Sequence, residues 1–205
     1  MYRLIIISLL MLSINNVSAQ DPQDSKDFES RIESVSTTNK SIQCDFEQRK
    51  RVKGIKDEVE SHGRFYYDNR GVMSLLYDEP KGDKIVINGE RFEVVTSGKV
   101  VEGEASENPM MMQICNMLQA CMSGNVTRLG RGWQSDVVLI SGQYIVTLQP
   151  TDRRTRRYIE SLVLTFNHED MTLDEMKMNE SSGGYTHYRF INKEINKSID
   201  PQKFE

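Results

Sequence analysis

Hydrophobic and polar residues alternate along most of this chain, and this two-residue period limits the folds it can adopt. In the segment 42–47, Ile, Cys and Phe alternate with Gln, Asp and Glu, which is typical of a strand with one buried and one solvated face. The same pattern predicts further strands at about 58–68, 72–78, 83–88, 90–96, 99–102, 135–140, 143–149, 158–167, 172–180 and 184–191. About eleven strands in succession predict one antiparallel sheet, which must curl or split at this size.

Short turns are expected to join these strands. Asn88-Gly89 is a strong signal for a two-residue hairpin loop, in which both central residues need a positive φ. Ser97-Gly98, Ser141-Gly142 and Gly183-Gly184 indicate further turns. Because we find no internal repeat and no linker, we expect one domain over residues 20–205.

Two segments depart from the two-residue period and predict helices. Phe28, Ile32 and Val35 recur at the spacing of one helix face, so a helix is expected from about residue 22 or 24 to residue 39. Asn108 can cap and Pro109 can open a second helix, which runs to about residue 122. These two helices are the segments available to cover the inner face of the sheet.

The first nineteen residues predict a signal peptide. Arg3 supplies a positive start, residues 4–12 are apolar except for one Ser, and residues 17–19 end in small side chains. The apolar run is too short to span a bilayer as a helix. We therefore expect cleavage after Ala19 and a soluble periplasmic chain, with an uncleaved membrane anchor as the alternative.

Charge and motif content exclude several classes of function. The net charge is −4, whereas nucleic-acid-binding domains usually carry a basic excess. The sequence has no GxSxG, HExxH or phosphate-binding loop, and its three His share no metal-ligand spacing. We therefore expect no enzyme, no cofactor and no metal. Cys44, Cys115 and Cys121 are interpreted as buried apolar side chains.

The second predicted helix is rich in methionine. Five Met lie between residues 110 and 122, and this flexible side chain suits surfaces that accept variable apolar partners. The helix is therefore either a lid or lining for a lipid groove, or ordinary core. Strand residues leave the same choice open, because lining a cavity and filling a core look identical in sequence. They are Phe65, Tyr67, Met73, Leu75, Tyr77, Phe92 and Val94.

A basic turn offers a second candidate surface. Residues 151–157 contain four arginines, Arg153, Arg154, Arg156 and Arg157. Such a turn is either a docking site for anionic headgroups or an acidic partner, or a solvated hairpin tip. The segment 49–53 holds a second group of basic residues with the same two interpretations.

An ordered set of short motifs, from about Phe28 to Phe204, resembles the periplasmic outer-membrane lipoprotein carrier family, the LolA-like proteins. The motifs lie at 42–48 (IQCDFEQ), 62–67 (HGRFYY), 76–80 (LYDEP), 85–89 (IVING), 108–111 (NPMM) and 144–150 (YIVTLQP). The resemblance implies an incomplete antiparallel β-barrel with lid helices over an apolar cavity. In that family, an inner-membrane ATP-driven transporter loads acylated lipoprotein, and an outer-membrane acceptor receives it.

The resemblance also implies roles for individual residues. The cavity would be lined by Phe65, Tyr67, Met73, Leu75, Phe92, Val94, Met110, Met111, Ile114, Met117 and Leu118. Arg70 lies one position from the arginine that locks the family's lid, and no Pro follows it. The expected protein is a monomeric carrier of lipoproteins or related lipids. The alternatives are an envelope-stress sensor on the same fold and an esterase-like hydrolase.

Overall fold

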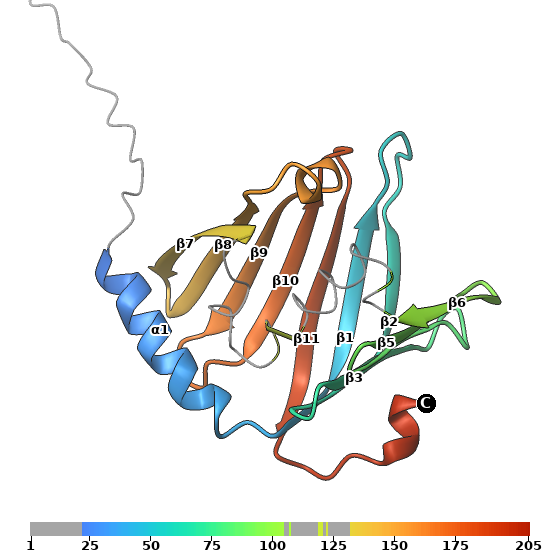
Figure 1. Ribbon diagram of the computed structural model, residues 1–205, viewed down its shortest axis with the longest axis horizontal. Helices are drawn as coiled ribbons and strands as arrows, with labels where there is room; N and C mark the ends of the chain where they lie inside the picture. Colours follow the sequence, from blue (N-terminus) through green and yellow to red (C-terminus); the bar gives the residue numbers. More distant parts are fainter. Residues whose placement is uncertain (1–21, 105–106, 108–118, 121, 123–131) are drawn as a thin grey trace, which may run out of the picture.

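A single open antiparallel sheet dominates the computed structural model, which describes residues 22–104, 107, 119–120, 122 and 132–205 (Figure 1). Its order is β6-β5-β4-β3-β2-β1-β11-β10-β9-β8-β7, so β6 and β7 form the two free edges. The strands are β1 (Ser41–Arg51), β2 (Val59–Asp68), β3 (Val72–Tyr77), β4 (Lys84–Asn88), β5 (Arg91–Thr96), β6 (Lys99–Glu104), β7 (Trp133–Ile140), β8 (Gln143–Pro150), β9 (Ile159–Asn167), β10 (Leu173–Glu180) and β11 (Tyr185–Ile195). The predicted incomplete barrel of eleven strands is confirmed.

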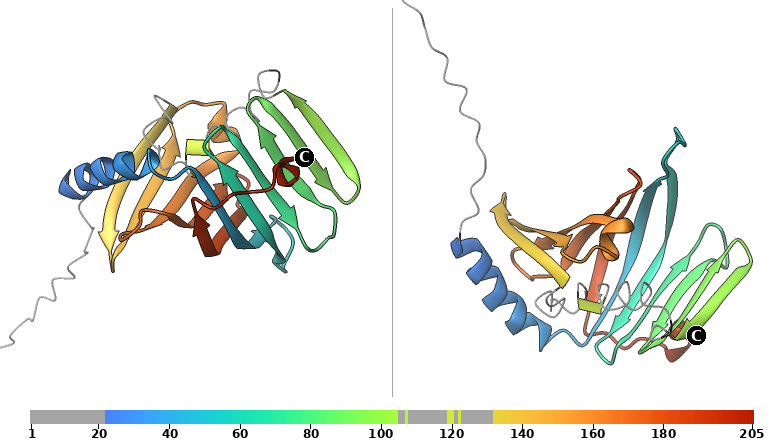
Figure 2. Two further views of the ribbon diagram at one scale, coloured as in Figure 1. Left: turned by 90° about the horizontal axis from the view of Figure 1, so that it is seen from below. Right: turned by 45° about the horizontal axis from the view of Figure 1, so that its top comes forward.

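The sheet curves strongly, so that β4–β6 turn away from the plane of β7–β9 (Figure 2). Every neighbouring pair is antiparallel, and nine of the ten pairs join strands that follow one another in the chain; the exception is the pairing of β1 with β11. That pairing joins the two halves of the sheet at its centre. Curvature gives the sheet one face that can be enclosed and one that faces outward.

The turn predictions are confirmed with one correction. Ser97 and Gly98 both have a positive φ (51° and 75°), as do Ser141 and Gly142 (51° and 76°). At the β4–β5 hairpin, however, Asn88 stays in the ladder opposite Arg91, and the loop consists of the two residues after it. Only the first of these, Gly89, has a positive φ (61°). The predicted position of this two-residue loop was therefore wrong by one residue. The observed loop needs a positive φ only at its first residue, and Gly89 provides it.

The inner face, defined here as the sheet face on which α1 packs, carries the hydrophobic core. The pairing of the strands places their buried side chains on one face, because residues directly opposite each other in antiparallel strands point to the same side of the sheet. The series runs from Val137 on β7 through Val146 and Leu164 on β8 and β9 to Met176 on β10. Across the central pairing it continues from Phe190 to Phe46.

Helix α1 (Pro22–Ser36) confirms the first predicted helix, although it ends three residues earlier than expected. It lies across the sheet end formed by β7–β9 (Figure 1). The Phe28 ring meets the rings of Tyr144 and Phe166, each with centroids 5.3 Å apart. Asp24 accepts a hydrogen bond from the Leu139 amide at 2.9 Å, so the start of the helix is also fixed.

Arg31 holds the same helix to the β9–β10 turn. Its guanidinium donates to His168 Nε2 at 2.6 Å and also to the His168 carbonyl. The Tyr144 hydroxyl donates to Asp27, and the Tyr144 ring stacks on His168. The helix is therefore attached to this end of the inner face by apolar and polar contacts together.

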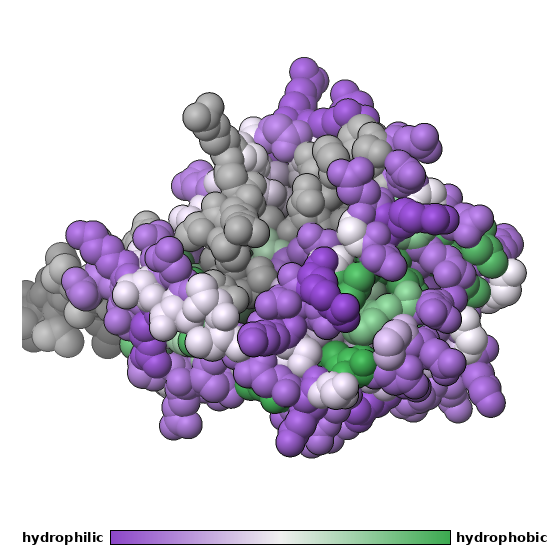
Figure 3. Space-filling view, turned by 60° about the horizontal axis from the view of Figure 1, so that its bottom comes forward, coloured by the Kyte–Doolittle hydropathy of each residue, from purple (hydrophilic) through white to green (hydrophobic). Residues whose placement is uncertain are grey.

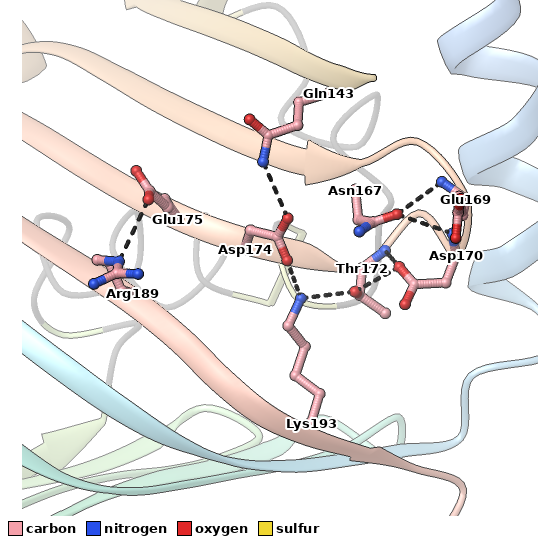
Figure 4. Close-up of polar contacts among 9 residues, drawn as sticks. All are labelled: Gln143, Asn167, Glu169, Asp170, Thr172, Asp174, Glu175, Arg189 and Lys193. Atoms are coloured by element: carbon pink, nitrogen blue, oxygen red, sulfur yellow. Dashed lines mark hydrogen bonds and ion pairs between the residues drawn. The ribbon is translucent and has the colours of Figure 1, made fainter. Parts of the chain in front are cut away.

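The outer face is polar where β8–β11 lie. Lys193 bonds Asp174 and also donates to Thr172 Oγ1 at 2.8 Å, while Gln143 donates to Asp174 (Figure 4). Arg189 pairs with Glu175 at 3.5 Å on the same face. These polar contacts join β8, β10 and β11.

The C-terminal residues cover the outer face of β3 and β4. A short 3₁₀ helix, η4 (Pro201–Phe204), was not predicted. Phe204 is buried, and Ser74 donates to the Lys203 carbonyl at 2.6 Å. With the bottom of Figure 1 turned forward, the surface in Figure 3 is mainly hydrophilic, with small hydrophobic areas between the hydrophilic side chains.

Cys44 is fully buried on β1 and carries a free thiol, which confirms its interpretation as an apolar core residue. Burial raises its pKa to about 12, against smaller opposing effects of Lys193 and Arg64. We expect native Cys44 to alkylate with iodoacetamide at about pH 8 more than a hundredfold slower than in the unfolded chain, because thiolate is the nucleophile. Pulsed alkylation with peptide mass mapping measures this ratio, and equal rates in both states would contradict it.

Several sequence predictions fall on residues outside those that the structure describes. They are the leader over residues 1–19, Met110, Met111, Ile114, Met117, Leu118, Cys115 and Cys121. Gln119, Ala120 and Met122 are described and helical, as expected for the end of the second helix. Among the helices in the described ranges, none has the length and apolarity to cross a membrane.

Candidate functional site

The strand residues singled out in the sequence lie together on the inner face. Phe65 stands opposite Leu75, Tyr67 opposite Met73, and Phe92 two strands further along. These five side chains are buried, each with 6% or less of its surface exposed. Val94 packs against them and is only partly buried. The structure therefore brings six predicted residues into one apolar surface, and their role in lining a cavity stays a prediction.

Four further aromatic residues belong to this surface: Tyr77, which the sequence marked as lining or core, and Phe46, Tyr188 and Phe190, which were not among the predicted site residues. Phe46 makes edge contacts with Tyr77 and Tyr188, at centroid distances of 5.0 and 6.0 Å. Phe190 contacts the Phe65 ring at 5.3 Å and stacks parallel to Tyr188. The two-residue period marks each of them as facing one side of its strand, but only the pairing of β1 with β11 shows that this side is shared.

Two tyrosine hydroxyls meet within the aromatic group. Tyr77 and Tyr188 bring their oxygens to 3.3 Å. Burial is the largest cause that raises the pKa of both phenols well above the ordinary value. Both hydroxyls therefore stay protonated at physiological pH, and this part of the inner face carries no charge.

Gln48 lies beside the same aromatic group. It is opposite Tyr188 on the neighbouring strand, two residues beyond Phe46 on β1. Its Oε1 atom is buried and has no hydrogen-bond partner among the described residues. An unpaired buried acceptor costs about 1–3 kcal/mol, so a ligand that brings an N–H or O–H donor here would recover this free energy.

The apolar surface continues beyond its buried part toward the β6 edge. Val94 on β5 stands opposite both Ile85 and Val101. Phe92 is 6% exposed, whereas Val101 is 59% exposed. Apolar side chains on one face thus pass from buried to solvent-exposed over two strands, which is the gradient expected at the mouth of an apolar binding surface.

Arg70 is bound within its own turn. Its guanidinium makes two hydrogen bonds to the Asp68 carboxylate, at 2.8 and 2.9 Å, and this partner lowers the pKa of Asp68. In the same β2–β3 connection, the Gly71 carbonyl accepts a hydrogen bond from Gln119 Nε2 at 3.2 Å. The end of the second helix therefore meets the turn that carries Arg70, and a locking role for Arg70 stays a prediction.

The four arginines of the basic turn lie on the connection between β8 and β9, which includes a 3₁₀ turn, η3 (Thr155–Arg157). Arg156 donates to the Pro150 carbonyl at 2.7 Å. The Asp152 carboxylate accepts backbone N–H groups of Arg154 and Thr155. Among the described residues, none of the four arginines forms an ion pair, and all four are exposed. Their role in docking stays a prediction.

The three histidines are spread over different parts of the sheet. His62 lies 3.9 Å from Asp78, His187 lies 3.1 Å from Glu175, and His168 is bound by Arg31. Within the described ranges, no Ser or Cys is hydrogen-bonded to any of them, and no group of three or more His, Cys, Asp or Glu could hold a metal ion.

Comparison with known proteins gives a family and a fold. The family model described as outer membrane lipoprotein carrier protein LolA matches residues 37–205. No curated protein matches the chain. Among solved structures, a DUF1329 family protein from Desulfovibrio piger is 11% identical, with a TM-score of 0.51, over 91% of this chain and 98% of that one.

Two further solved structures are similar to this chain. MucB is 13% identical with a TM-score of 0.51, and the match covers 89% of this chain but only 62% of MucB. A LolA superfamily protein from Nitrosomonas europaea is 10% identical with a TM-score of 0.44, over 89% of this chain and 97% of that one. At these identities the likeness extends to the fold alone.

Proposed function

The chain belongs to the family of outer membrane lipoprotein carrier protein LolA, and from this premise we propose that it binds the acyl chains of lipoproteins or related lipids on its inner face. In this proposal it is a carrier and not an enzyme. It takes cargo from an ATP-driven transporter in the inner membrane and delivers it to an acceptor in the outer membrane. The leader over residues 1–19 exports it to the periplasm, where residues 20–205 act as one domain.

One observation carries the proposal: the apolar residues of the inner face extend from β7 to β5, and Val101 on β6 continues this apolar surface to solvent. Val101 leaves more than half of its surface exposed beside partly buried Val94. An acyl chain laid along this face would cover that surface.

The energetics suit reversible carriage. Each buried CH₂ contributes about 0.8 kcal/mol, so an acyl chain of about sixteen carbons gains on the order of 12 kcal/mol. A bilayer offers a similar gain, so the face needs only to match the bilayer roughly for cargo to be exchanged. Methionine suits such a face because its side chain adapts to irregular partners. In our proposal, the segment with this composition closes over the cargo through Met110, Met111, Ile114, Met117 and Leu118.

A charged side chain on the inner face is expected to abolish acyl binding. Val94→Asp puts a carboxylate at a partly buried position, where the fold tolerates it better than in the core. We expect the affinity for a fluorescent fatty acid to fall at least tenfold, since a carboxylate beside an acyl chain must lose hydration. Fluorescence titration measures the dissociation constant.

Val95→Asp is the matched control. Val95 is the next residue on β5 and is also partly buried, but it points to the outer face. It should leave the affinity for the fatty acid within about twofold. Equal losses in the two variants, or a chain that takes up no fatty acid at all, would contradict acyl binding on the inner face.

The cargo itself can be identified by native mass spectrometry of the protein recovered from the periplasm, followed by lipid extraction. Co-purifying acylated protein or lipid that Val94→Asp loses and Val95→Asp keeps would support the carrier. A protein partner without acyl chains would instead support a sensor of envelope stress on the same fold.

A further inference from the structure

Three connections between strands lie close together at one end of the strands, which is distinct from the free edge strands β6 and β7. The β1–β2 hairpin, the β10–β11 turn and the β8–β9 connection are seen together at the top of Figure 1. Ser181 joins two of them, because its amide donates to the Tyr158 carbonyl at 3.1 Å and its hydroxyl to the Arg156 carbonyl at 2.7 Å. Tyr185 joins the third by donating to Glu58. We call residues 49–60 and 151–158 together the basic edge.

The basic edge has the opposite charge to the rest of the chain. It holds nine Lys and Arg against four Asp and Glu, a net charge of +5, whereas the whole chain has −4. Its acidic side chains are largely occupied. Glu60 pairs with Arg49 at 3.1 Å, Glu58 pairs with Arg51 at 3.6 Å, and Asp152 accepts backbone N–H groups.

Seven cations on this edge form no ion pair among the described residues, and one of them, Arg156, donates to the Pro150 carbonyl. Among the same residues, the other six side chains make no such contact. They are Lys50, Lys53, Lys56, Arg153, Arg154 and Arg157, all of them exposed. Cations without local partners on two neighbouring connections present a positive surface that is not neutralised from within.

Apolar side chains project from the same edge. Ile55 is 54% exposed at the tip of the β1–β2 hairpin, and Val59 at its base is 53% exposed. Tyr158, at the end of the arginine turn, is 56% exposed. The basic edge therefore combines exposed apolar side chains with exposed cations on the same two connections.

We propose that the basic edge docks on an anionic phospholipid bilayer, with the Lys and Arg side chains on the headgroups and Ile55, Val59 and Tyr158 in the interface. Apolar side chains flanked by cations are what a surface-bound, non-spanning protein uses to hold an anionic membrane. The purpose of this docking rests on the proposed function, because a carrier must meet a membrane to exchange an acyl chain.

The test is binding to vesicles by the exported protein, recovered from the periplasm and shown by its mass to have lost the leader. Vesicles of phosphatidylglycerol with phosphatidylcholine are compared with vesicles of phosphatidylcholine alone. We expect co-sedimentation with the anionic vesicles only, and a loss of binding as salt is raised. Absence of binding to anionic vesicles, or equal binding to both, would overturn the proposal and leave an acidic protein as the partner for this edge.

Two double variants separate the contributions of the basic and the apolar side chains to vesicle binding. Arg153→Gln with Arg154→Gln should weaken binding at least tenfold, since each cation near the surface is worth about fivefold. Ile55→Ser with Tyr158→Ser should weaken it about tenfold. Val100→Ser with Ile140→Ser is the control, because these side chains are similarly exposed (58% and 50%) but lie on β6 and β7, the two free edge strands. Unchanged binding by either edge variant would overturn the docking arrangement.

Acyl uptake distinguishes this proposal from the carrier function. Both edge variants should take up the fluorescent fatty acid as the unmodified protein does, since neither alters the inner face. Fatty-acid uptake without vesicle binding would contradict membrane docking by the basic edge and leave the carrier function supported. Vesicle binding without fatty-acid uptake would contradict the carrier function and leave membrane docking by the basic edge supported.

Discussion

Gly63→Ala is expected to lower the free energy of unfolding by about 3 kcal/mol or more. A Cβ atom on Gly63 would lie 2.0 Å from the carbonyl oxygen of Leu76 and 2.9 Å from the Tyr77 Cα. These are backbone atoms of the neighbouring strand, which cannot move without breaking the pairing of β2 with β3. Urea unfolding followed by circular dichroism measures the loss.

Gly132→Ala is the matched control for this substitution. No atom lies within 4 Å of where its Cβ would stand, so it should change stability by less than about 0.5 kcal/mol. If Gly63→Ala were as stable as this control, the close approach of β2 and β3 would not exist in solution.

Phe28→Ala is expected to cost about 3–5 kcal/mol, the usual range for removing a buried phenylalanine. Phe28 is 1% exposed and contacts the rings of Tyr144 and Phe166. Its removal leaves α1 held by buried Ile32 and by the polar contacts of Asp24 and Arg31. Urea unfolding gives the loss of stability, and hydrogen exchange shows whether the α1 amides lose protection before those of the sheet.

Glu29→Ala, on the next residue and exposed to solvent, provides the comparison for α1. It retains helix propensity and removes no packing, so we expect a change below about 0.5 kcal/mol. Similar losses for the two variants would mean that α1 contributes through its helix propensity and not through the Phe28 contact.

Much of the fold follows from local sequence, because strand positions, turn positions and the first helix depend on residues close to one another in the chain. Ser97-Gly98 and Ser141-Gly142 adopt the predicted positive φ. The β4–β5 loop lies one residue later than predicted, because Gly89 can occupy either the first or the second position of a two-residue loop. The C-terminal 3₁₀ helix was missed because Phe204 is a single apolar residue in a polar tail.

The candidate site depends on contacts that local patterns do not determine. The alternation of apolar and polar residues predicted that Phe65 and Leu75 each lie on the apolar face of their strand. In the structure they are directly opposite each other on that face. The alternation could not show that Phe190 joins them, because that contact depends on the pairing of β1 with β11. Whether such a face is filled or receives a ligand is a question of volume and exposure, which a residue pattern does not carry.

The central pairing of β1 with β11 also has a consequence for how the chain reaches its native state. The bond from Asn192 to Asp45 across this pairing joins residues 147 positions apart. The other strand pairs in β1–β6 are hairpins between consecutive strands. Local hairpins form early, whereas a pairing that closes so long a loop bears a large entropic cost and forms late. A growing or translocating chain therefore holds two separate half-sheets until residue 190 arrives, and the apolar face becomes whole only when synthesis is nearly finished.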